Sequence, residues 1–293
     1  MRIVFIGSVD FSRHTLLHLV RMKAHVVGVC CKSVSNFNAD FSDLKPTCEE
    51  LQIPCLHVND INECGTVDWI KKLQPDVIFC FGWSSLLKRE ILSLTPFGVI
   101  GYHPAALPLN RGRHPLIWAL ALGLTKTASS FFLMDESADG GDIVSQFELF
   151  IDFKDDASSL YKKMVKTAKR QLDEILPALE LGRLQRIKQN HVLVNYWRKR
   201  EPKDGRIDWR MNSIMIYNLI RALAKPYVGA EFIWRDQIVK VWKSGLAVCA
   251  DSNIEPGKIL KVQCEGVVIK CGVGAIFLME TTPSFLPNVG EYL

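Results

Sequence analysis

Short apolar runs rich in β-branched residues alternate with amphipathic stretches through the first half of the chain. The first run, residues 2–7, precedes a stretch in which Leu16, Leu19 and Val20 recur at helical spacing. Further apolar runs that predict buried strands lie at residues 25–31, 76–81, 98–102, 128–134 and 142–148. A long amphipathic helix is predicted over residues 155–181. This alternation indicates an α/β fold, a doubly wound and mostly parallel sheet with a Rossmann-like core.

The pattern changes near residue 190. Residues 190–204 are polar and basic, which is typical of a linker or of a segment that crosses the surface. After one more predicted helix come short strands separated by glycine turns, at residues 230–234, 238–242, 257–262, 266–271 and 275–279. Such strands predict a small β-barrel or sandwich. We therefore expect a larger domain, a linker and a small β domain, at residues 1–189, 190–210 and 211–293.

Composition and charge narrow the class of protein. Of the 293 residues 48% are hydrophobic and 23% charged, which is typical of a globular chain. The longest apolar runs are too short to cross a bilayer, and the chain opens on a strand-like segment instead of a secretory signal. The nine cysteines lack zinc-finger or CxxC spacing and are interpreted as reduced core residues of a cytoplasmic protein. A net charge of +5 suits a small anionic substrate and argues against a nucleic-acid partner.

Open sheets of this kind bind ligands beyond the carboxyl ends of their strands. The loops after Gly7, Phe81 and Tyr102 are therefore the predicted places for chemistry. The first of these loops lacks the GxGxxG pattern, which disfavours a nicotinamide enzyme. The chain has no Walker sequence either, which disfavours a P-loop NTPase.

Three features at or near these strand ends carry candidate chemistry. His103 directly follows an apolar strand, which places its imidazole at a strand end where ligands bind. Taken alone, the position could equally well hold a histidine in a turn. Arg111 and Arg113 flank a glycine and can present fork-shaped donors to a phosphate or a carboxylate. Asp139 lies on a glycine turn before a strand, a pattern that by itself more often marks a simple hairpin.

Taken in order, the motifs resemble the folate-dependent formyltransferase family over nearly the whole chain. The segments that carry the resemblance are residues 4–11 (VFIGSVDF), 103–104 (HP), 107–108 (LP), 111–112 (RG), 139–144 (DGGDIV), 204–209 (DGRIDW), 239–242 (VKVW) and 256–257 (PG). The family includes methionyl-tRNA, glycinamide-ribonucleotide and sugar N-formyltransferases. The resemblance implies that the small domain is an OB-like β-barrel.

The resemblance also implies a reaction, the transfer of a formyl group from 10-formyltetrahydrofolate to an amine, with no metal. His103 matches the family's catalytic histidine, which would accept the amine proton. Asp139 matches the catalytic aspartate, which would orient that histidine and stabilise its charge. For the folate the resemblance points to the loop after the strand at 76–81 together with the aspartate: Phe81, Gly82, Trp83, Leu86 and Asp139. The aromatic residues among them are also common core residues.

The chain departs from the family at residue 101, where the usual Asn-x-His pattern has Gly101 in place of the asparagine. Positions 101 and 103 share one face of a strand, so the missing amide would have pointed into the reaction space. Loss of one such oxyanion donor typically costs about 3–4 kcal/mol. Protonated His103, Asn110 or a water in the vacated space could take its place, and we expect a repaired site.

Residues 32–45, where initiator-tRNA enzymes of the family carry a basic insertion, hold two lysines against two aspartates. Asn36, Asn38 and Asp40 in this region could bind sugar hydroxyls, or could belong to a solvated polar loop. The Arg-Gly-Arg loop is similar to that of the sugar-nucleotide members, whose substrates carry a pyrophosphate. The residues expected to bind such a substrate are Ser8, Asp10, Arg111, Arg113, Arg198 and Lys203.

These features predict a sugar N-formyltransferase that acts on a nucleotide-linked deoxy-amino sugar, by resemblance in bacterial glycan biosynthesis. Two alternatives stay open: a methionyl-tRNA formyltransferase, and a non-catalytic protein that binds folate or a nucleotide sugar, which Gly101 would favour. We expect no nucleic-acid and no membrane partner. Exposed strands of the small domain could pair edge to edge in a homodimer.

Overall fold

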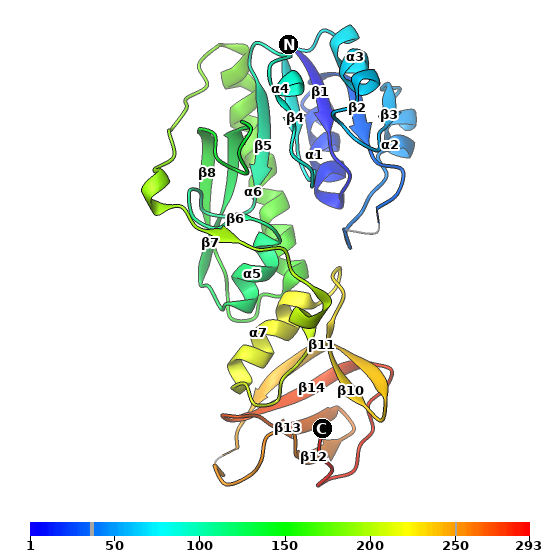
Figure 1. The fold of residues 1–293 in the computed structure, drawn as a ribbon, viewed down its shortest axis with the longest axis vertical. Coiled ribbons are helices and arrows are strands. Elements are labelled where there is room, and N and C mark those ends of the chain that lie inside the picture. The colour runs from blue at the N-terminus through cyan, green and yellow to red at the C-terminus, as the bar shows by residue number, and fades with distance from the viewer. Residues whose placement is uncertain (36–37, 250) are drawn as a thin grey trace. The chain divides into compact units, whose positions relative to one another are not determined.

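The computed structural model describes residues 1–35, 38–249 and 251–293, so Asn36 of the candidate sugar-binding loop lies outside the described residues. The chain forms two compact units (Figure 1). The first contains Met1–Pro115, Thr127–Leu149 and Lys162–Trp197. The second contains Leu116–Lys126, Phe150–Tyr161 and Arg198–Leu293. Within the described ranges, no helix combines the length and the apolar character that a membrane crossing requires.

Strands and helices alternate through the first unit and give way to strands in the second. The strands are β1 (Arg2–Ile6), β2 (His25–Cys31), β3 (Cys55–His57), β4 (Val77–Cys80), β5 (Val99–His103), β6 (Arg111–Gly112), β7 (Lys126–Leu133), β8 (Ile143–Phe150), β9 (Tyr196–Trp197), β10 (Ala230–Trp234), β11 (Gln237–Ala247), β12 (Ile259–Gln263), β13 (Gly266–Lys270) and β14 (Ala275–Thr282). The helices are α1 (Asp10–Arg21), α2 (Lys45–Glu50), α3 (Cys64–Lys72), α4 (Arg89–Leu92), α5 (Pro115–Ala121), α6 (Ala157–Glu180) and α7 (Ser213–Leu223), with short 3₁₀ turns at His191–Leu193 and Pro202–Gly205.

The main sheet has seven strands in the order β3-β2-β1-β4-β5-β7-β8. Strands β1 to β5 pair in parallel, and β7 is antiparallel to β5. The chain proceeds outward from β1 to β3 and then returns to β4 on the other side of β1, so the strand order reverses between β1 and β4. This reversal point is where open α/β sheets bind their ligands. The loops after β1 and β4 border it, and His103 ends the neighbouring strand β5.

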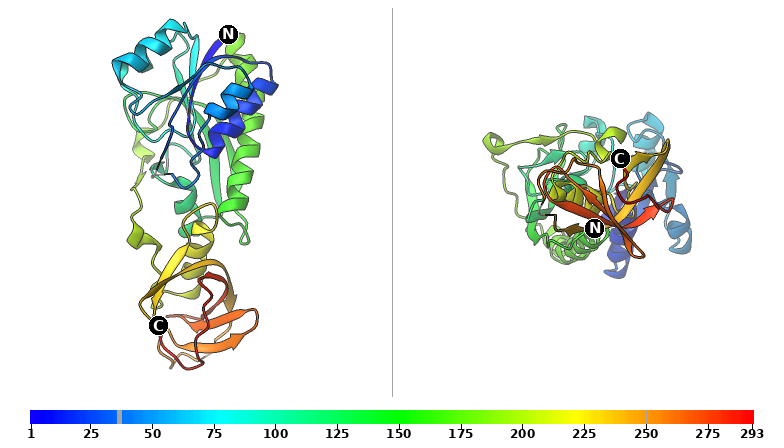
Figure 2. Two further views of the ribbon diagram at one scale, coloured as in Figure 1. Left: turned by 90° about the vertical axis from the view of Figure 1, so that its right-hand side faces the viewer. Right: turned by 90° about the horizontal axis from the view of Figure 1, so that it is seen from below.

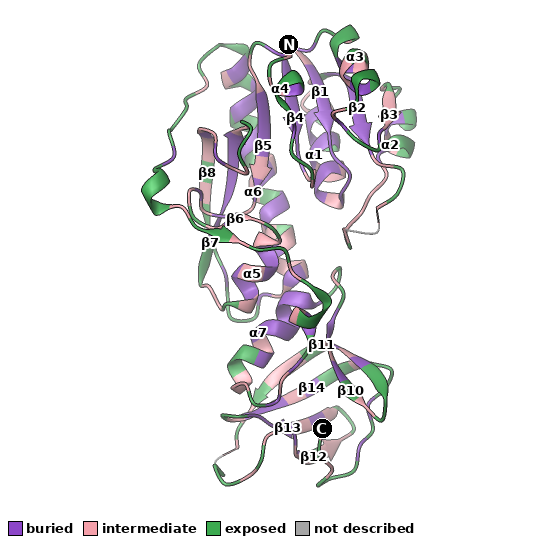
Figure 3. Ribbon diagram, in the orientation of Figure 1, coloured by how far each residue is buried: buried purple, intermediate pink, exposed green. Residues whose placement is uncertain are grey.

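Alternate strand residues pack against helices on opposite faces of this sheet. Ile6 and Cys80 belong to a buried cluster with Ile70 of α3 and Ile91 of α4. On the other face the ring of Tyr102 stacks on Phe11 of α1, with ring centroids 4.1 Å apart. Helices α1 and α6 lie side by side there (Figure 2). Because both faces are covered, the inner strands are largely buried (Figure 3) and form continuous apolar runs.

The backbone at the reversal point is closely packed. A Cβ atom on Gly7 would lie 2.4 Å from the carbonyl oxygen of Phe81 and 2.5 Å from Ser12 Oγ. Because glycine has no Cβ atom, Gly7 lets the loops after β1 and β4 approach each other. Ser12 Oγ donates a hydrogen bond of 2.5 Å to the same carbonyl and ties the two loops together.

The second unit contains an antiparallel five-stranded sheet in the order β10-β11-β14-β13-β12. An aromatic cluster fills its core, in which Trp209 and Phe232 pack edge to face with ring centroids 5.3 Å apart, and Phe285 packs on Phe232 at 5.0 Å. The predicted fold class is confirmed: a mostly parallel, doubly wound sheet is followed by a small antiparallel β unit.

Candidate active site

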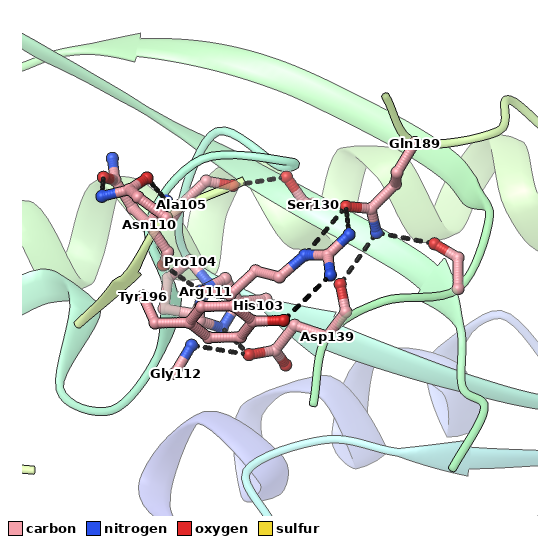
Figure 4. A network of polar contacts seen from close by, with 12 residues as sticks. His103, Pro104, Ala105, Asn110, Arg111, Gly112, Ser130, Asp139, Gln189 and Tyr196 are labelled. Carbon is pink, nitrogen blue, oxygen red and sulfur yellow. Dashed lines mark hydrogen bonds and ion pairs between the residues drawn. The ribbon is translucent and has the colours of Figure 1, made fainter. Parts of the chain in front are cut away.

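His103 is buried at the carboxyl end of β5, with 4% of its surface exposed. Its Nε2 lies 2.7 Å from the backbone oxygen of Asn110 (Figure 4). A carbonyl oxygen can only accept a hydrogen bond, so Nε2 is protonated and Nδ1 of the neutral ring is not. Nδ1 lies 3.6 Å from Oδ2 of Asp139, which is an ion-pair distance. The ring is therefore held in the tautomer whose Nδ1 can accept a proton, beside a carboxylate that stabilises the resulting charge.

Asp139 lies in the loop between β7 and β8 and has a left-handed backbone, with φ +55°. Its Oδ2 accepts a hydrogen bond of 2.9 Å from the backbone N–H of Gly112, which directs the carboxylate toward His103. The loop passes very close to β7, because a Cβ atom on Gly141 would lie only 1.7 Å from the carbonyl oxygen of Leu133. Glycine at 141 is thus required for the position of Asp139.

Arg111 supports this loop from inside the protein, where only 2% of its surface is exposed. Its Nε and Nη2 donate to Oε1 of Gln189 at 3.2 and 2.7 Å, and Nη1 donates to the Tyr196 hydroxyl at 3.3 Å. Gln189 Nε2 in turn donates to the carbonyl oxygens of Asp139 and Gly141, at 2.8 and 2.6 Å. The guanidinium of Arg111, which was expected to bind substrate, is thus buried and engaged in holding the Asp139 loop.

The segment after α6 contributes residues that the sequence did not point to: Gln189, Asn195 and Tyr196. Strand β9, Tyr196–Trp197, pairs in parallel with β6, Arg111–Gly112. This pairing brings residues that are 85 positions apart into contact, as in the bond between Arg111 and Tyr196. The only signal in the sequence is the pair of aromatic residues, Tyr196 and Trp197, inside a stretch that is otherwise polar and basic.

Asn110 acts on His103 through its backbone. Its φ of +61° turns the chain so that its carbonyl oxygen accepts the bond from His103. Its side chain is turned away from Asp139 (Figure 4), and its Oδ1 accepts from Asn195 Nδ2 at 3.3 Å. The Asn110 carbonyl thus positions the imidazole, whereas its side chain, a candidate oxyanion donor, bonds Asn195.

The space beside Gly101 is filled by two apolar side chains. A Cβ atom there would lie 2.8 Å from Cγ of Met134 and 2.9 Å from Cζ of Phe132. Phe132 is the cross-strand partner of Gly101 in the antiparallel pair of β5 and β7. Phe132 and Met134 belong to an apolar cluster with Leu107 and Ile143. The space in which a water was one possible replacement for the amide is occupied by the protein itself.

The residues after β4 that were expected to cradle the folate have different environments. Phe81 is fully buried and packs edge to face on Phe5 and Phe131, so its side chain belongs to the core. Gly82 has a φ of +70°, which turns the loop away from the strand. Trp83 is half-buried, and Lys32 Nζ lies 5.1 Å from its ring centroid. Leu86 is exposed.

Ser8 and Asp10 lie after β1, on the border of the reversal point. Ser8 is buried, and its Oγ accepts a hydrogen bond of 2.6 Å from the backbone N–H of Lys32. The Asp10 carboxylate pairs with Arg13 at 3.3 Å and with His14 at 3.4 Å on the first turn of α1. The Ser8 side chain therefore joins the loops after β1 and β2, while the Asp10 side chain is partly exposed.

The three remaining basic candidates are all exposed but belong to different units. Arg113 belongs to the first unit, as His103 does, and is exposed. Arg198 belongs to the second unit, where both of its terminal nitrogens bond the Asp204 carboxylate at 2.7 and 2.6 Å. This bidentate contact holds the pKa of Asp204 well below its usual range. Lys203 is exposed and pairs with Glu201 at 2.8 Å.

The two halves of the Gln189 side chain can be tested separately. Gln189→Glu keeps an acceptor for Arg111 but replaces the donor to Asp139 and Gly141 by an oxygen that repels their carbonyl groups. We expect it to lower kcat by about 5- to 150-fold, the equivalent of about 1–3 kcal/mol for buried groups left unpaired. Steady-state kinetics measure kcat, and thermal unfolding measures the change in stability.

Gln189→Leu removes both halves and should lower the melting temperature more than Gln189→Glu does, since it leaves the buried Arg111 guanidinium without its main acceptor. Equal kcat for Gln189→Glu and the parent would mean that Gln189 serves only to bury Arg111.

Comparison with known proteins agrees with this architecture. The model of the formyl transferase family matches residues 1–176, and the model of the formyl transferase C-terminal domain matches residues 199–284. The chain therefore belongs to the formyl transferase family, and the resemblance drawn from its motifs is confirmed.

Individual relatives are similar over most of this chain. It is 35% identical over 231 residues to the bifunctional polymyxin resistance protein ArnA of Wigglesworthia glossinidia brevipalpis. The matched region covers 79% of this chain but only 35% of the length of ArnA. The fold is similar to that of WlaRD, a sugar 3N-formyl transferase whose structure was solved with dTDP and 5-N-formyl-THF (TM-score 0.71, 17% identity, 97% of this chain and 99% of that chain). It is also similar to the N-formyltransferase of Helicobacter canadensis in complex with folinic acid and dTDP-3-aminofucose (TM-score 0.70, 16% identity, 94% and 98%).

Proposed function

We propose that this chain transfers a formyl group from 10-formyltetrahydrofolate to the amine of a nucleotide-linked amino sugar. The observation that carries the proposal is the pair of His103 and Asp139 at the carboxyl end of β5, in a chain of the formyl transferase family. Both residues match the catalytic positions of that family. Both are held in place by backbone groups, His103 by the Asn110 carbonyl and Asp139 by the Gly112 N–H.

The hydrogen bonds of His103 support one direction of proton movement. The protonated Nε2 is engaged with the Asn110 carbonyl, so Nδ1 is the atom that accepts the proton of the substrate amine. Asp139, 3.6 Å away, stabilises the positive imidazole that results. Phe132 and Met134 fill the space beside Gly101, and the Asn110 side chain is turned away. We therefore infer that, once Nδ1 of His103 has accepted the amine proton, its N–H becomes the hydrogen-bond donor to the negative charge of the tetrahedral intermediate.

The loop after β4 has features that fit a folate, which would supply the formyl carbon. Its backbone turns at Gly82, where a Cβ atom would collide with Val9 Cγ2. Trp83 Nε1 is buried and has no hydrogen-bond partner among the described residues. A buried donor without a partner is unusual in a native protein, and a polar atom of a bound ligand would satisfy it. The pterin of a folate carries several such acceptors.

The choice of a nucleotide sugar as acceptor rests on Arg113 and on the similar proteins. Arg113 is exposed, and its backbone N–H is anchored to the carbonyl of Trp197 at 3.0 Å. This anchor fixes the backbone of an exposed arginine next to Gly112, whose N–H bonds Asp139, and a guanidinium suits the pyrophosphate of a nucleotide sugar. WlaRD and the Helicobacter canadensis enzyme were solved with dTDP or a dTDP-linked amino sugar.

The purified chain with 10-formyltetrahydrofolate, assayed against a panel of uridine- and thymidine-linked amino sugars, tests the proposal. We expect one sugar to gain the mass of a formyl group in a reaction that depends on both substrates. Formylation of initiator methionyl-tRNA instead would identify the tRNA activity, with binding that weakens steeply as salt is raised. Saturable binding of folate and sugar without transfer would identify a binding protein. Sedimentation of the same preparation tests the predicted homodimer.

Arg113→Ala should weaken binding of the nucleotide sugar by about 10- to 150-fold, the equivalent of about 1.5–3 kcal/mol for a hydrogen bond to a charged group. Binding of folate should change little. Titration of each ligand separately by calorimetry measures the two constants, and Arg183→Ala, another exposed arginine of the same unit, is the matched control. A similar loss for both ligands would show that the loop has collapsed and would remove Arg113 from the sugar site.

A further inference from the structure

Four side chains capable of binding a metal ion converge at the edge of the main sheet, away from His103. Strand β3 is the edge strand, and it carries Cys55 and His57 two residues apart. Residues two apart on a strand point to the same face. In the parallel pairing of β2 with β3, His57 lies opposite Cys31, the last residue of β2. Asp43 comes from the segment that leads into α2.

The potential ligand atoms of these residues are close together. His57 Nε2 lies 2.9 Å and Cys31 Sγ lies 3.5 Å from the same atom, Oδ1 of Asp43. The ligand atoms of Cys31, Asp43 and His57 all lie within 4.8 Å of one another. Cys55 Sγ is 3.6 Å from Cys31 Sγ. In a tetrahedral site with metal–ligand distances of about 2.0–2.3 Å, neighbouring ligand atoms are about 3.3–3.8 Å apart, so small shifts would open this cluster around an ion.

The arrangement of hydrogen bonds indicates that an ion would replace protons. Asp43 Oδ1 accepts from the Lys45 N–H at 2.9 Å as well as from His57 and Cys31, so three donors share one oxygen. A cation would take the place of the thiol protons of Cys31 and Cys55, and these two protons would leave to solvent when the ion binds. The ring proton of a neutral His57 would move from Nε2 to Nδ1, which frees Nε2 to bind the ion.

The set of ligands selects the kind of metal. Two thiols and an imidazole are soft or borderline ligands, which favour Zn²⁺ over Mg²⁺ or Ca²⁺. Cys31 is buried, whereas the side chains of His57 and Asp43 are 31% and 30% exposed, so an ion could enter from solvent.

We propose that Cys31, Asp43, Cys55 and His57 bind one Zn²⁺ ion at the edge formed by β2 and β3. The ion would clamp the Asp43 segment to the sheet. That segment also contacts the loop after β1, because the Ser42 N–H donates to the Ser8 carbonyl at 3.0 Å and the Asp10 N–H donates to the Asp40 carbonyl at 2.9 Å. The proposal is independent of the proposed reaction, since its readouts are metal content and stability.

The test begins with the chain stripped by a chelator in the presence of a reductant that does not bind metal. Added Zn²⁺ should bind at one equivalent per chain, with release of protons. Free Zn²⁺ at about 100 times the dissociation constant should raise the melting temperature by about 5 °C or more. Co²⁺ in place of Zn²⁺ should produce the visible absorption of a tetrahedral site and a thiolate charge-transfer band.

His57→Gln and Asp43→Asn should each weaken Zn²⁺ binding by more than about 100-fold. Loss of a residue that only supports a ligand typically costs about 10- to 100-fold in metal affinity, and loss of a ligand itself should cost more. Both side chains are partly exposed, so these variants should fold without metal. Cys64→Ser, which removes an exposed cysteine of the same unit, is the control and should bind as the parent does.

Two results would overturn the proposal. One is the absence of stoichiometric Zn²⁺ and of tetrahedral Co²⁺ absorption in the reduced parent chain. The other is a disulfide between Cys31 and Cys55 in the chain as isolated, found by peptide mass mapping, together with no uptake of Zn²⁺ after reduction. Binding that is the same in the parent, His57→Gln and Asp43→Asn would place the ion elsewhere and would also refute the site.

Discussion

His103→Ala is expected to lower kcat of formyl transfer by about 10²–10⁴-fold, the usual contribution of a positioned general base. Removal of the ring leaves no group at the end of β5 to accept the amine proton, and it leaves Asp139 without the charge that it stabilises. Binding of folate and of the nucleotide sugar should be nearly unchanged. Steady-state kinetics and separate ligand titrations measure both effects.

Two further variants separate chemistry from structure at this position. His103→Gln can still donate a hydrogen bond to the Asn110 carbonyl but cannot act as a base, so it should keep the fold and be nearly as slow as His103→Ala. His25→Ala, which removes an exposed histidine at the start of β2, should behave as the parent. A rate for His103→Ala within a few-fold of the parent would show that another group accepts the proton.

Gly101→Asn, which restores the usual residue of the family, is expected to damage the protein and not to improve it. The new side chain would push into Met134 and Phe132, an overpacking that typically costs about 1–3 kcal/mol. Its amide would also be buried among apolar groups, at an additional cost of about 1–3 kcal/mol if it finds no partner. We therefore expect a lower free energy of unfolding, measured by denaturant titration, and slower transfer.

The structure supplies the controls for this prediction. Gly65→Asn is matched, because a Cβ atom on Gly65 has no neighbour within 4 Å, and it should leave stability nearly unchanged. The double variant Gly101→Asn/Met134→Ala removes Cγ and Sδ of Met134, two of the three nearest atoms, and should recover part of the stability. A Gly101→Asn protein that is as stable as the parent and faster would mean that residue 101 opens into the reaction space after all.

Much of the fold could be predicted from the pattern of apolar residues. The runs at residues 2–7 and 25–31 became β1 and β2, and the long amphipathic stretch at 155–181 became α6. The two strands are buried on both faces, and α6 is a long helix with one buried face, so each leaves a strong continuous or periodic signal. Strand β3 has only three residues, all half-buried, and it pairs through one edge; the sequence gives no comparable signal for it.

The sequence pointed to His103 and Asp139, which lie 3.6 Å apart in the structure, and their catalytic roles stay a prediction. It did not point to the supporting contacts. Arg111 binds Gln189, which is 78 residues away, and a long-range pair of this kind leaves no local pattern. Gly101 shows the same limit of prediction from sequence. The sequence shows that residue 101 has no side chain, but it does not show the antiparallel register that places Phe132 opposite this residue.

The positive φ values of Asn110 and Asp139, +61° and +55°, restrict which mutations these positions can tolerate. Asparagine and aspartate adopt the left-handed region more readily than other side-chain-bearing residues. A glutamate at 139 would keep the negative charge but would have to adopt a backbone conformation that it disfavours. The conformational demand and the chemical demand therefore select the same residue, and mutational tolerance at 139 reports on both at once.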